Sequence, residues 1–393
     1  MDGPPRHSSV NGLWLRRDLL CAGARATAAG AVGSFALNAS ASAAVDVPEA
    51  ARQLHRESLV VDLHVDTFLW VRLLGYDLGH RHANYLPWHP FGWHADLPRL
   101  QEGGVGAVGF GIVVNPRTTR SELMLPLKLL SWYERQRGFD AVLATLDLMH
   151  ETARRYPAQF AFVRSGSELR AARAAGKIAG FACLEGAHGI EGSLDHVRTA
   201  YERGLRSIGL VHFQATEAGY PMTVAQFDGQ GLTEFGRELI GEMERLGMLV
   251  DLAHLNDAGF AEALATMRRP FMVSHACCRA LEGHRRNLTD AQIRAVADRG
   301  GVVGMAFERS FLGGAGDLDR VLDHFDHAIK VGGEDVVAIG SDYDGFIIPA
   351  SGLEDVTTLP RMTAGLLARG HRPPTVRKVL GENALRLLTE ICG

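Results

Sequence analysis

Short runs of apolar and often β-branched residues alternate with helical patterns from residue 59 onward. These runs are apolar almost throughout, which is typical of strands that are buried on both faces of a parallel sheet. We therefore predict eight strands, at residues 59–66, 107–114, 180–185, 207–212, 248–254, 271–275, 302–307 and 336–342.

The segments between these runs repeat apolar residues at helical spacing. Leu239, Ile240, Met243 and Leu246 recur in this way, and Gly247 ends the pattern. Eight strand-and-helix units over about 330 residues predict an α/β fold, the (β/α)8 or TIM barrel with insertions. An open, doubly wound sheet is the alternative, but no G-x-G-x-x-G motif follows any of the predicted strands.

The composition excludes several classes of protein. The chain has 393 residues and is 46% hydrophobic, which is enough to bury a large core and excludes a disordered chain. Its net charge of −4 lacks the basic excess that nucleic-acid-binding proteins usually show. It contains 17 histidines against five cysteines, and histidine is a common ligand of zinc and related metals.

The first 43 residues have the pattern of a signal peptide rather than of a folded domain. Arg16 and Arg17 precede a weakly apolar run, and small residues allow cleavage after Ala41 or Ala43. The arginine pair resembles the twin-arginine type of signal, which predicts a periplasmic or secreted protein. A disordered or merely hydrophobic leader is the alternative. Residues 44–393 are then expected to form a single barrel domain without a stable membrane anchor.

Polar side chains stand at the carboxyl ends of six of the predicted strands. In a (β/α)8 barrel these ends meet at one face and build the active site. His64 and Asp66 lie two residues apart, so the alternation of a strand directs both into the mouth of the barrel. The other strand ends carry Glu185, His212, His254, His275 and Asp342.

This mixture of imidazole and carboxylate groups predicts a metal site. Zinc, manganese and iron accept both ligand types, whereas calcium and magnesium prefer oxygen ligands. Four histidines and several carboxylates are too many for one tetrahedral ion, but they suit two ions that share a bridging carboxylate and a bridging water. A single histidine at a strand end is more often a hydrogen-bonded structural residue, so the prediction depends on the joint placement.

The remaining histidines are interpreted as structural or surface residues. His324 and His327 lie in a helical pattern and are expected to be exposed to solvent, while His188 and His284 lie near the mouth without an assigned role. Four more lie in a loop after the first strand that is expected to form a rim or lid, with a second metal site as the weaker alternative. These four are His80, His82, His89 and His94.

Seven short motifs occur in order along the chain. Together they resemble the membrane (renal) dipeptidase family of zinc metallopeptidases, which belongs to the amidohydrolase-like barrels. The resemblance runs from about Leu59 to Leu388 and implies the same barrel and the same class of reaction. The motifs are VDLHVD at 61–66, EGAHGI at 185–190, VDLAH at 250–254, SH at 274–275, RRN at 285–287, GSDYDG at 340–345 and GENALR at 381–386.

By this resemblance two zinc ions (Zn2+) are bound in each subunit. His64 and Asp66 would bind the first ion, and His254 and His275 would bind the second. Glu185 would bridge the two ions. A hydroxide held between them would attack the scissile carbonyl of the substrate.

The resemblance also implies residues that contact the substrate. His212 corresponds to the residue that stabilises the tetrahedral oxyanion, and Asp342 to the acid that transfers a proton and binds the substrate amine. Arg286 corresponds to the residue that binds the substrate carboxylate. Two positions depart from the family's well-studied members: Phe311 stands where they carry a tyrosine, and Phe213 begins a segment that is small and polar in them.

The leading hypothesis is therefore a zinc-dependent dipeptidase that cleaves dipeptides with a free amino end and a free carboxyl end. A binuclear-metal amidohydrolase that acts on N-acyl amino acids, lactones or other small amides is the alternative within the same fold. A non-catalytic periplasmic binding protein on a degenerate barrel is a third interpretation, and the presence of every expected ligand argues against it. The family resemblance also implies a homodimer.

Overall fold

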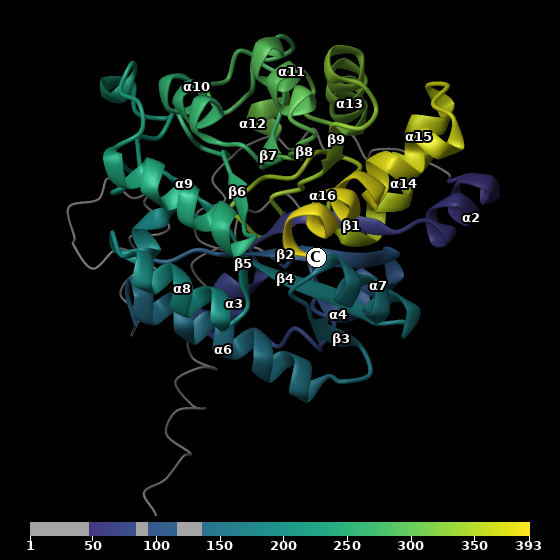
Figure 1. Ribbon diagram of the computed structural model, residues 1–393. Helices are drawn as coiled ribbons and strands as arrows, with labels where there is room; N and C mark the ends of the chain where they lie inside the picture. The colour runs from purple at the N-terminus through teal and green to yellow at the C-terminus, as the bar shows by residue number, and fades with distance from the viewer. Residues whose placement is uncertain (1–46, 84–92, 116–135) are drawn as a thin grey trace, which may run out of the picture. The chain divides into compact units, whose positions relative to one another are not determined.

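A barrel of parallel strands surrounded by helices forms the body of the molecule (Figure 1). The computed structural model describes residues 47–83, 93–115 and 136–393. The strands are β1 (Val60–Val65), β2 (Val105–Ile112), β3 (Phe160–Phe162), β4 (Ile178–Leu184), β5 (Leu205–Gly209), β6 (Leu249–Asp251), β7 (Met272–Ala276), β8 (Val302–Met305) and β9 (Val337–Ile339).

The sheet closes on itself through eight of these strands. β1 pairs with β2 on one side and with β9 on the other, and β2 also pairs with β4. The order around the ring is therefore β1, β2, β4, β5, β6, β7, β8 and β9, with all pairs parallel. Since helices connect consecutive ring strands, the predicted (β/α)8 barrel is confirmed.

β3 is the strand that the sequence pattern did not predict. It has three residues, Phe160–Phe162, and pairs with the first residues of β4 outside the ring. A run this short is below the length at which apolar periodicity indicates a strand. The eight predicted strands each correspond to one strand of the ring, but several of them end earlier than predicted.

The helices cover the outside of the ring, and many begin at a side chain that caps them. Thr289 and Gln292 form a reciprocal capping box, and Ser165, Ser193 and Thr233 each accept a hydrogen bond from the third residue of a helix. The helices are α2 (Glu49–Glu57), α3 (Thr67–Leu74), α4 (Leu97–Glu102), α6 (Phe139–Arg155), α7 (Gly166–Ala174), α8 (Leu194–Glu202), α9 (Glu234–Leu246), α10 (Asp257–Thr266), α11 (Asp290–Asp298), α12 (Arg309–Leu312), α13 (Leu318–Gly332), α14 (Leu359–Ala368), α15 (Pro373–Arg377) and α16 (Asn383–Cys392).

The carboxyl-terminal helix α16 closes the amino-terminal end of the barrel. Its buried residues Leu387 and Ile391 belong to one apolar cluster with Leu249, Met272 and Val302. The last three are the first residues of β6, β7 and β8, so the cluster lies where these strands begin. The apolar end is thus filled, and the carboxyl ends of the strands are left to carry polar groups.

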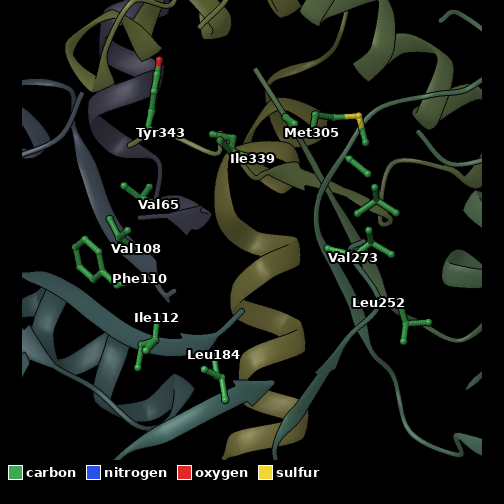
Figure 2. Packing of buried hydrophobic residues seen from close by; sticks show 14 of the residues in the cluster. Val65, Val108, Phe110, Ile112, Leu184, Leu252, Val273, Met305, Ile339 and Tyr343 are labelled. Atoms are coloured by element: carbon green, nitrogen blue, oxygen red, sulfur yellow. The ribbon is translucent and has the colours of Figure 1, made fainter. Parts of the chain in front are cut away.

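A larger apolar cluster packs the helices against the strands. Figure 2 shows part of it, including Val108, Phe110 and Ile112 of β2 together with Leu184 of β4. Ile112 and Leu184 are paired in the β2–β4 ladder, and both are fully buried or nearly so. This packing makes the ring rigid, so the loops that follow the strands start from fixed positions.

The predicted signal peptide lies outside the described residues, and the boundary at residue 43 stays a prediction. Within residues 47–83, 93–115 and 136–393, no helix combines the length and the apolar character that crossing a bilayer requires.

Strands β7, β8 and β9 approach one another so closely that glycine is required between them. A Cβ atom added to Gly304 would overlap the carbonyl oxygen of Ser274 and press on Gly340. We predict that Gly304→Ala lowers the free energy of unfolding by about 1–3 kcal/mol, because neither backbone can move away. Urea denaturation of the variant and the parent protein measures the change.

Gly241 provides the matched control, because a Cβ atom added there meets nothing within 4 Å. It lies within helix α9, so Gly241→Ala should leave stability unchanged or raise it by up to about 1 kcal/mol. Equal effects of the two substitutions would contradict the close approach of the strands.

Candidate active site

The predicted site residues gather at the carboxyl ends of the strands. His64 lies within β1 and His275 within β7. Asp66 and Glu185 are the first residues after β1 and β4. These four side chains therefore start from the rigid ring itself.

His212, His254 and Asp342 lie in loops, each three residues past the end of β5, β6 and β9. The sequence pattern placed them within strands, and this was wrong for a conformational reason. His254 and Asp342 have φ angles of 68° and 66°, in the left-handed region that extended strands do not use. Such strain in residues other than glycine concentrates at functional sites.

The Glu185 carboxylate is the centre of the cluster. Its Oε1 atom lies 3.0 Å from Nε2 of His254 and 3.4 Å from Nε2 of His212. The same oxygen lies 3.5 Å from Nε2 of His275 and 3.7 Å from Nε2 of His64. All five side chains are more than nine-tenths buried. Two strands and two of the loops that follow strands thus bring four imidazoles to one buried carboxylate oxygen.

The cluster contains ligand atoms that could hold metal ions. Such atoms lie within 4.8 Å of one another in three overlapping groups of residues, and Glu185 belongs to two of them. These groups are His64–Asp66–Glu185, Glu185–His254–His275 and His64–His275–Asp342.

The missing hydrogen-bond partners and the spacing of these ligand atoms fit a bound metal ion. Nε2 of His64 and Oδ1 of Asp66 are buried without a hydrogen-bond partner, which is costly unless another group satisfies them. The Nε2 atoms of His254 and His275 lie 2.9 Å apart, near the spacing of about 3.3 Å between two nitrogen ligands of a tetrahedral zinc ion. The donor set of nitrogen and oxygen atoms also suits zinc.

Burial and neighbouring charges shift the pKa values of the acidic groups. Burial raises the pKa of Glu185 well above its ordinary value, and the nearby Asp66 carboxylate adds to the effect. Burial also raises the pKa of Asp342. For His64, burial by itself would lower the pKa, but Asp66 and Glu185 together raise it to about 10. A bound cation would replace these protons, because metal ligands must be deprotonated.

The other three imidazoles of the cluster are neutral, because in them the effect of burial is not outweighed by nearby carboxylates. Burial lowers the pKa of His212, His254 and His275 well below the ordinary value, and the positive charge of Arg286 lowers that of His254 and His275 further. Neutral imidazole is the form that binds metals. It can also donate one hydrogen bond without carrying a charge.

A pocket opens above the cluster, and the space between its walls is about 360 Å³ when open solvent is counted. Its polar wall includes the predicted residues Asp66, Glu185, His212, His254, Arg286 and Asp342. Its apolar wall is made by Val113, Phe213, Phe311 and Phe346.

Arg286 lies in this pocket with part of its guanidinium unpaired. One of its terminal nitrogens donates to the backbone carbonyl of His275 at 3.2 Å, and its Nε is buried without a hydrogen-bond partner. The guanidinium also lies 5.4 Å from the centre of the Phe311 ring. A buried cation of this kind is suited to bind an anionic group of a ligand.

The structure corrects the interpretation of two other histidines. His324 was expected to be exposed but is fully buried, where its Nδ1 accepts from the Cys278 amide and its Nε2 contacts the Leu312 carbonyl oxygen. His94 was expected on a rim but is also buried, where its amide donates to Oδ1 of Asp344 and its Nδ1 accepts from the Asp344 amide. His324 thus connects α13 to Cys278 and to the end of α12, and His94 connects the segment before α4 to the segment after β9.

The remaining histidines outside the cluster have ordinary partners or stay unassigned. His327 is partly exposed and pairs with Asp290 at 2.7 Å, and His188 is buried with its Nε2 at 2.9 Å from the Val114 carbonyl oxygen. In the described part of the loop after β1, His82 stacks on Tyr76. His89 lies outside the described residues.

Val113, Phe346 and two glycines were not among the predicted site residues. A Cβ atom on Gly111 or Gly345 would overlap a carboxylate oxygen of Asp66 or Asp342, so both glycines make room for these side chains. Gly345 stands within the GSDYDG motif and Phe346 directly follows it, so the motif itself was a signal. Val113 directly follows β2 and had no such signal.

Comparisons with known proteins identify the family of the chain. The family model described as membrane dipeptidase, peptidase family M19, matches residues 48–392. Dipeptidase verJ of Clonostachys rogersoniana is 32% identical over 302 residues, which is 76% of this chain and 76% of that protein.

Two solved structures share the fold at 30–31% sequence identity. A metallopeptidase from Rhodobacter sphaeroides, liganded with a phosphinate mimic of the dipeptide L-Ala-D-Ala, matches at 30% identity with a TM-score of 0.74, covering 85% of this chain and all of that one. A family M19 metallopeptidase described as dipeptidase AC matches at 31% identity and a TM-score of 0.74, covering 86% and 99% of the two chains. The chain belongs to the membrane dipeptidase family, peptidase family M19, and is a metallodipeptidase of that family.

Proposed function

We propose that this protein is a zinc-dependent dipeptidase, exported and assembled as a homodimer, that cleaves dipeptides with free amino and carboxyl ends. The observation that carries the proposal is the burial of Glu185 among four imidazoles, with nitrogen-to-oxygen distances of 3.0–3.7 Å. The relative from Rhodobacter sphaeroides, which binds a phosphinate mimic of L-Ala-D-Ala, supports a dipeptide substrate.

The ligand groups support two ions rather than one. His64 and Asp66 form one ligand group with Glu185, and His254 and His275 form another. Glu185 is common to both groups, which is the position of a bridging carboxylate. Two zinc ions there would lower the pKa of a water molecule toward neutrality and polarise the scissile carbonyl.

The protein's own groups would bind and orient the substrate. Arg286 would hold the carboxylate end, because its guanidinium is buried with an unpaired N–H. Asp342 would contact the amino end and carry a proton, and the burial that raises the pKa of its carboxyl favours the protonated form that this role needs. The neutral His212 would donate a hydrogen bond to the oxygen on which negative charge develops.

The apolar part of the pocket lining supports a substrate with apolar side chains. Phe213 and Phe346 form one side of it together with Val113, and Phe311 stands beside Arg286 on another. Requiring a charged group at each end of the substrate would exclude longer peptides, because their ends lie farther apart.

We predict that Glu185→Gln lowers kcat/KM for simple L,L-dipeptides by about 1,000-fold or more and reduces bound zinc from two ions per chain to at most one. The substitution removes the charge that both ligand groups share. Metal analysis and a dipeptide assay of the purified protein measure the two effects. Glu202→Gln, at an exposed position on α8, is the control and should change neither. A parent protein that binds zinc but cleaves no dipeptide would refute the proposal.

We predict that Arg286→Ala lowers kcat/KM for dipeptides by roughly 30- to 1,000-fold, about 2–4 kcal/mol, because the substrate carboxylate loses its buried partner. Dipeptide amides, which have no carboxylate, should be cleaved poorly by the parent protein and no worse by the variant. An equal loss on both substrates would favour an amidohydrolase that acts on other small amides.

Export by the twin-arginine route is the part of the proposal that concerns location. The Arg16–Arg17 pair ahead of an apolar run supports it. We predict that changing both arginines to lysine leaves the protein in the cytoplasm at its full length. The parent protein should be found in the periplasm, starting at Ser42 or Ala44 by amino-terminal sequencing. Unchanged export of the variant would contradict this route.

A further inference from the structure

Two aspartates outside the proposed ligand set occupy matching positions in the barrel. Asp62 lies in β1 and Asp251 is the last residue of β6. Both are buried, with exposed fractions of 1% and 5%. Each stands shortly before a histidine of the cluster, His64 or His254, in the same strand or the loop that follows it.

Asp62 connects β1 to the segment that follows β9. In the ladder between these strands Asp62 pairs with Ile339. Its Oδ1 accepts hydrogen bonds from the amide of His64 at 3.1 Å and from the amide of Ser341 at 3.0 Å. These donors lie two residues after each member of the ladder pair.

Asp251 connects β6 to β7 at the same offset from its ladder pair as Asp62. It pairs with Met272 in the ladder. Its Oδ1 accepts hydrogen bonds from the amides of Ala253 and Ser274, both at 2.9 Å. These donors again lie two residues after each member of the ladder pair.

We propose that Asp62 and Asp251 are positioning residues that clamp the strand ends carrying the metal ligands. One clamp holds the end of β1, with His64 and Asp66, to the segment with Asp342. The other holds the end of β6, which leads to His254, to the segment of β7 with His275. The inference rests on the proposed metal centre for its function, whereas its hydrogen bonds are observed directly.

The physical reason lies at the mouth of the barrel, where the regular ladder between β1 and β9 ends and only an isolated bridge, between Val65 and Tyr343, follows it. In each case the carboxylate oxygen accepts from two buried amides, one within a strand and one in the segment that follows the neighbouring or the same strand. Hydrogen bonds to a charged acceptor are stronger than those between neutral groups, so each aspartate holds both strands in place. Metal sites need their ligands held to within about 0.5 Å, and groups that orient the ligands strongly affect metal affinity.

An ordinary structural role is the competing interpretation, and Glu244 provides the matched control for it. Its Oε1 also accepts from two backbone amides, those of Arg268 and Arg269, at 2.7 and 2.8 Å. These residues precede β7, at the end of the strand opposite to the pocket. Glu244→Ala therefore removes two hydrogen bonds of similar length away from the cluster, at a more exposed position.

The experiment compares Asp62→Ala, Asp251→Ala and Glu244→Ala in the full mature protein. Zinc dissociation constants are measured by competition with a chelator, and thermal unfolding of the metal-free proteins is recorded alongside. We expect each aspartate variant to bind one of its two zinc ions about 10- to 100-fold more weakly, with a changed visible spectrum after cobalt substitution. Glu244→Ala should lose stability but keep its zinc affinity within about twofold.

A second measurement separates the clamp from the proposed function. Hydrogen exchange of the metal-free protein should become faster at Ser341 in Asp62→Ala and at Ser274 in Asp251→Ala. Asp62→Asn and Asp251→Asn keep the Oδ1 acceptor, so they should recover part of the protection of these amides against exchange. The same two variants replace the alanine variants in both measurements if the latter do not fold. If the parent protein binds no zinc, the proposed function fails while the exchange result still tests the clamp. The inference would be overturned if the aspartate variants lost no more zinc affinity than Glu244→Ala and showed no faster hydrogen exchange than it does.

Discussion

The burial of a carboxylate among four imidazoles is the constraint that the rest of this structure has to support. Glu185 and its neighbours are removed from water, which is unfavourable for charged groups unless they are paired or bind a cation. The raised pKa of Glu185 and the lowered pKa of His254 are two results of the same burial. A site of this kind is maintained only by a scaffold that is stable for other reasons.

The closed barrel supplies that stability at its opposite end. Helix α16 covers the first residues of β6, β7 and β8, so the apolar core is complete without the polar mouth. Close contacts between strands at Gly304 and Gly340 leave little freedom for the segments that follow. The left-handed backbone at His254 and Asp342 can persist there, because the surrounding structure offers these loops no relaxed alternative. The rigid barrel thus permits a strained backbone in the loops at its carboxyl-terminal mouth.

Much of the site was predictable because a barrel places every strand end on one face. Knowing eight strands in order was enough to expect His64, Glu185 and His275 near one another, and the structure brings them together. The buried states of His94 and His324 were not predictable, because polar residues in a loop or a helical pattern usually face solvent. Nor was β3, whose three residues gain their strand conformation from pairing with β4.

The sequence by itself determined the order of strands and helices, the chemistry of the donor groups and the family to which the chain belongs. Periodicity and residue type carry this information locally, and seven motifs in order make it specific. Tertiary structure alone decided the distances around Glu185, the apolar wall of Val113 and Phe346, and the matching registers of Asp62 and Asp251. These features depend on how separate strands align side by side, and no single segment of the chain encodes that alignment.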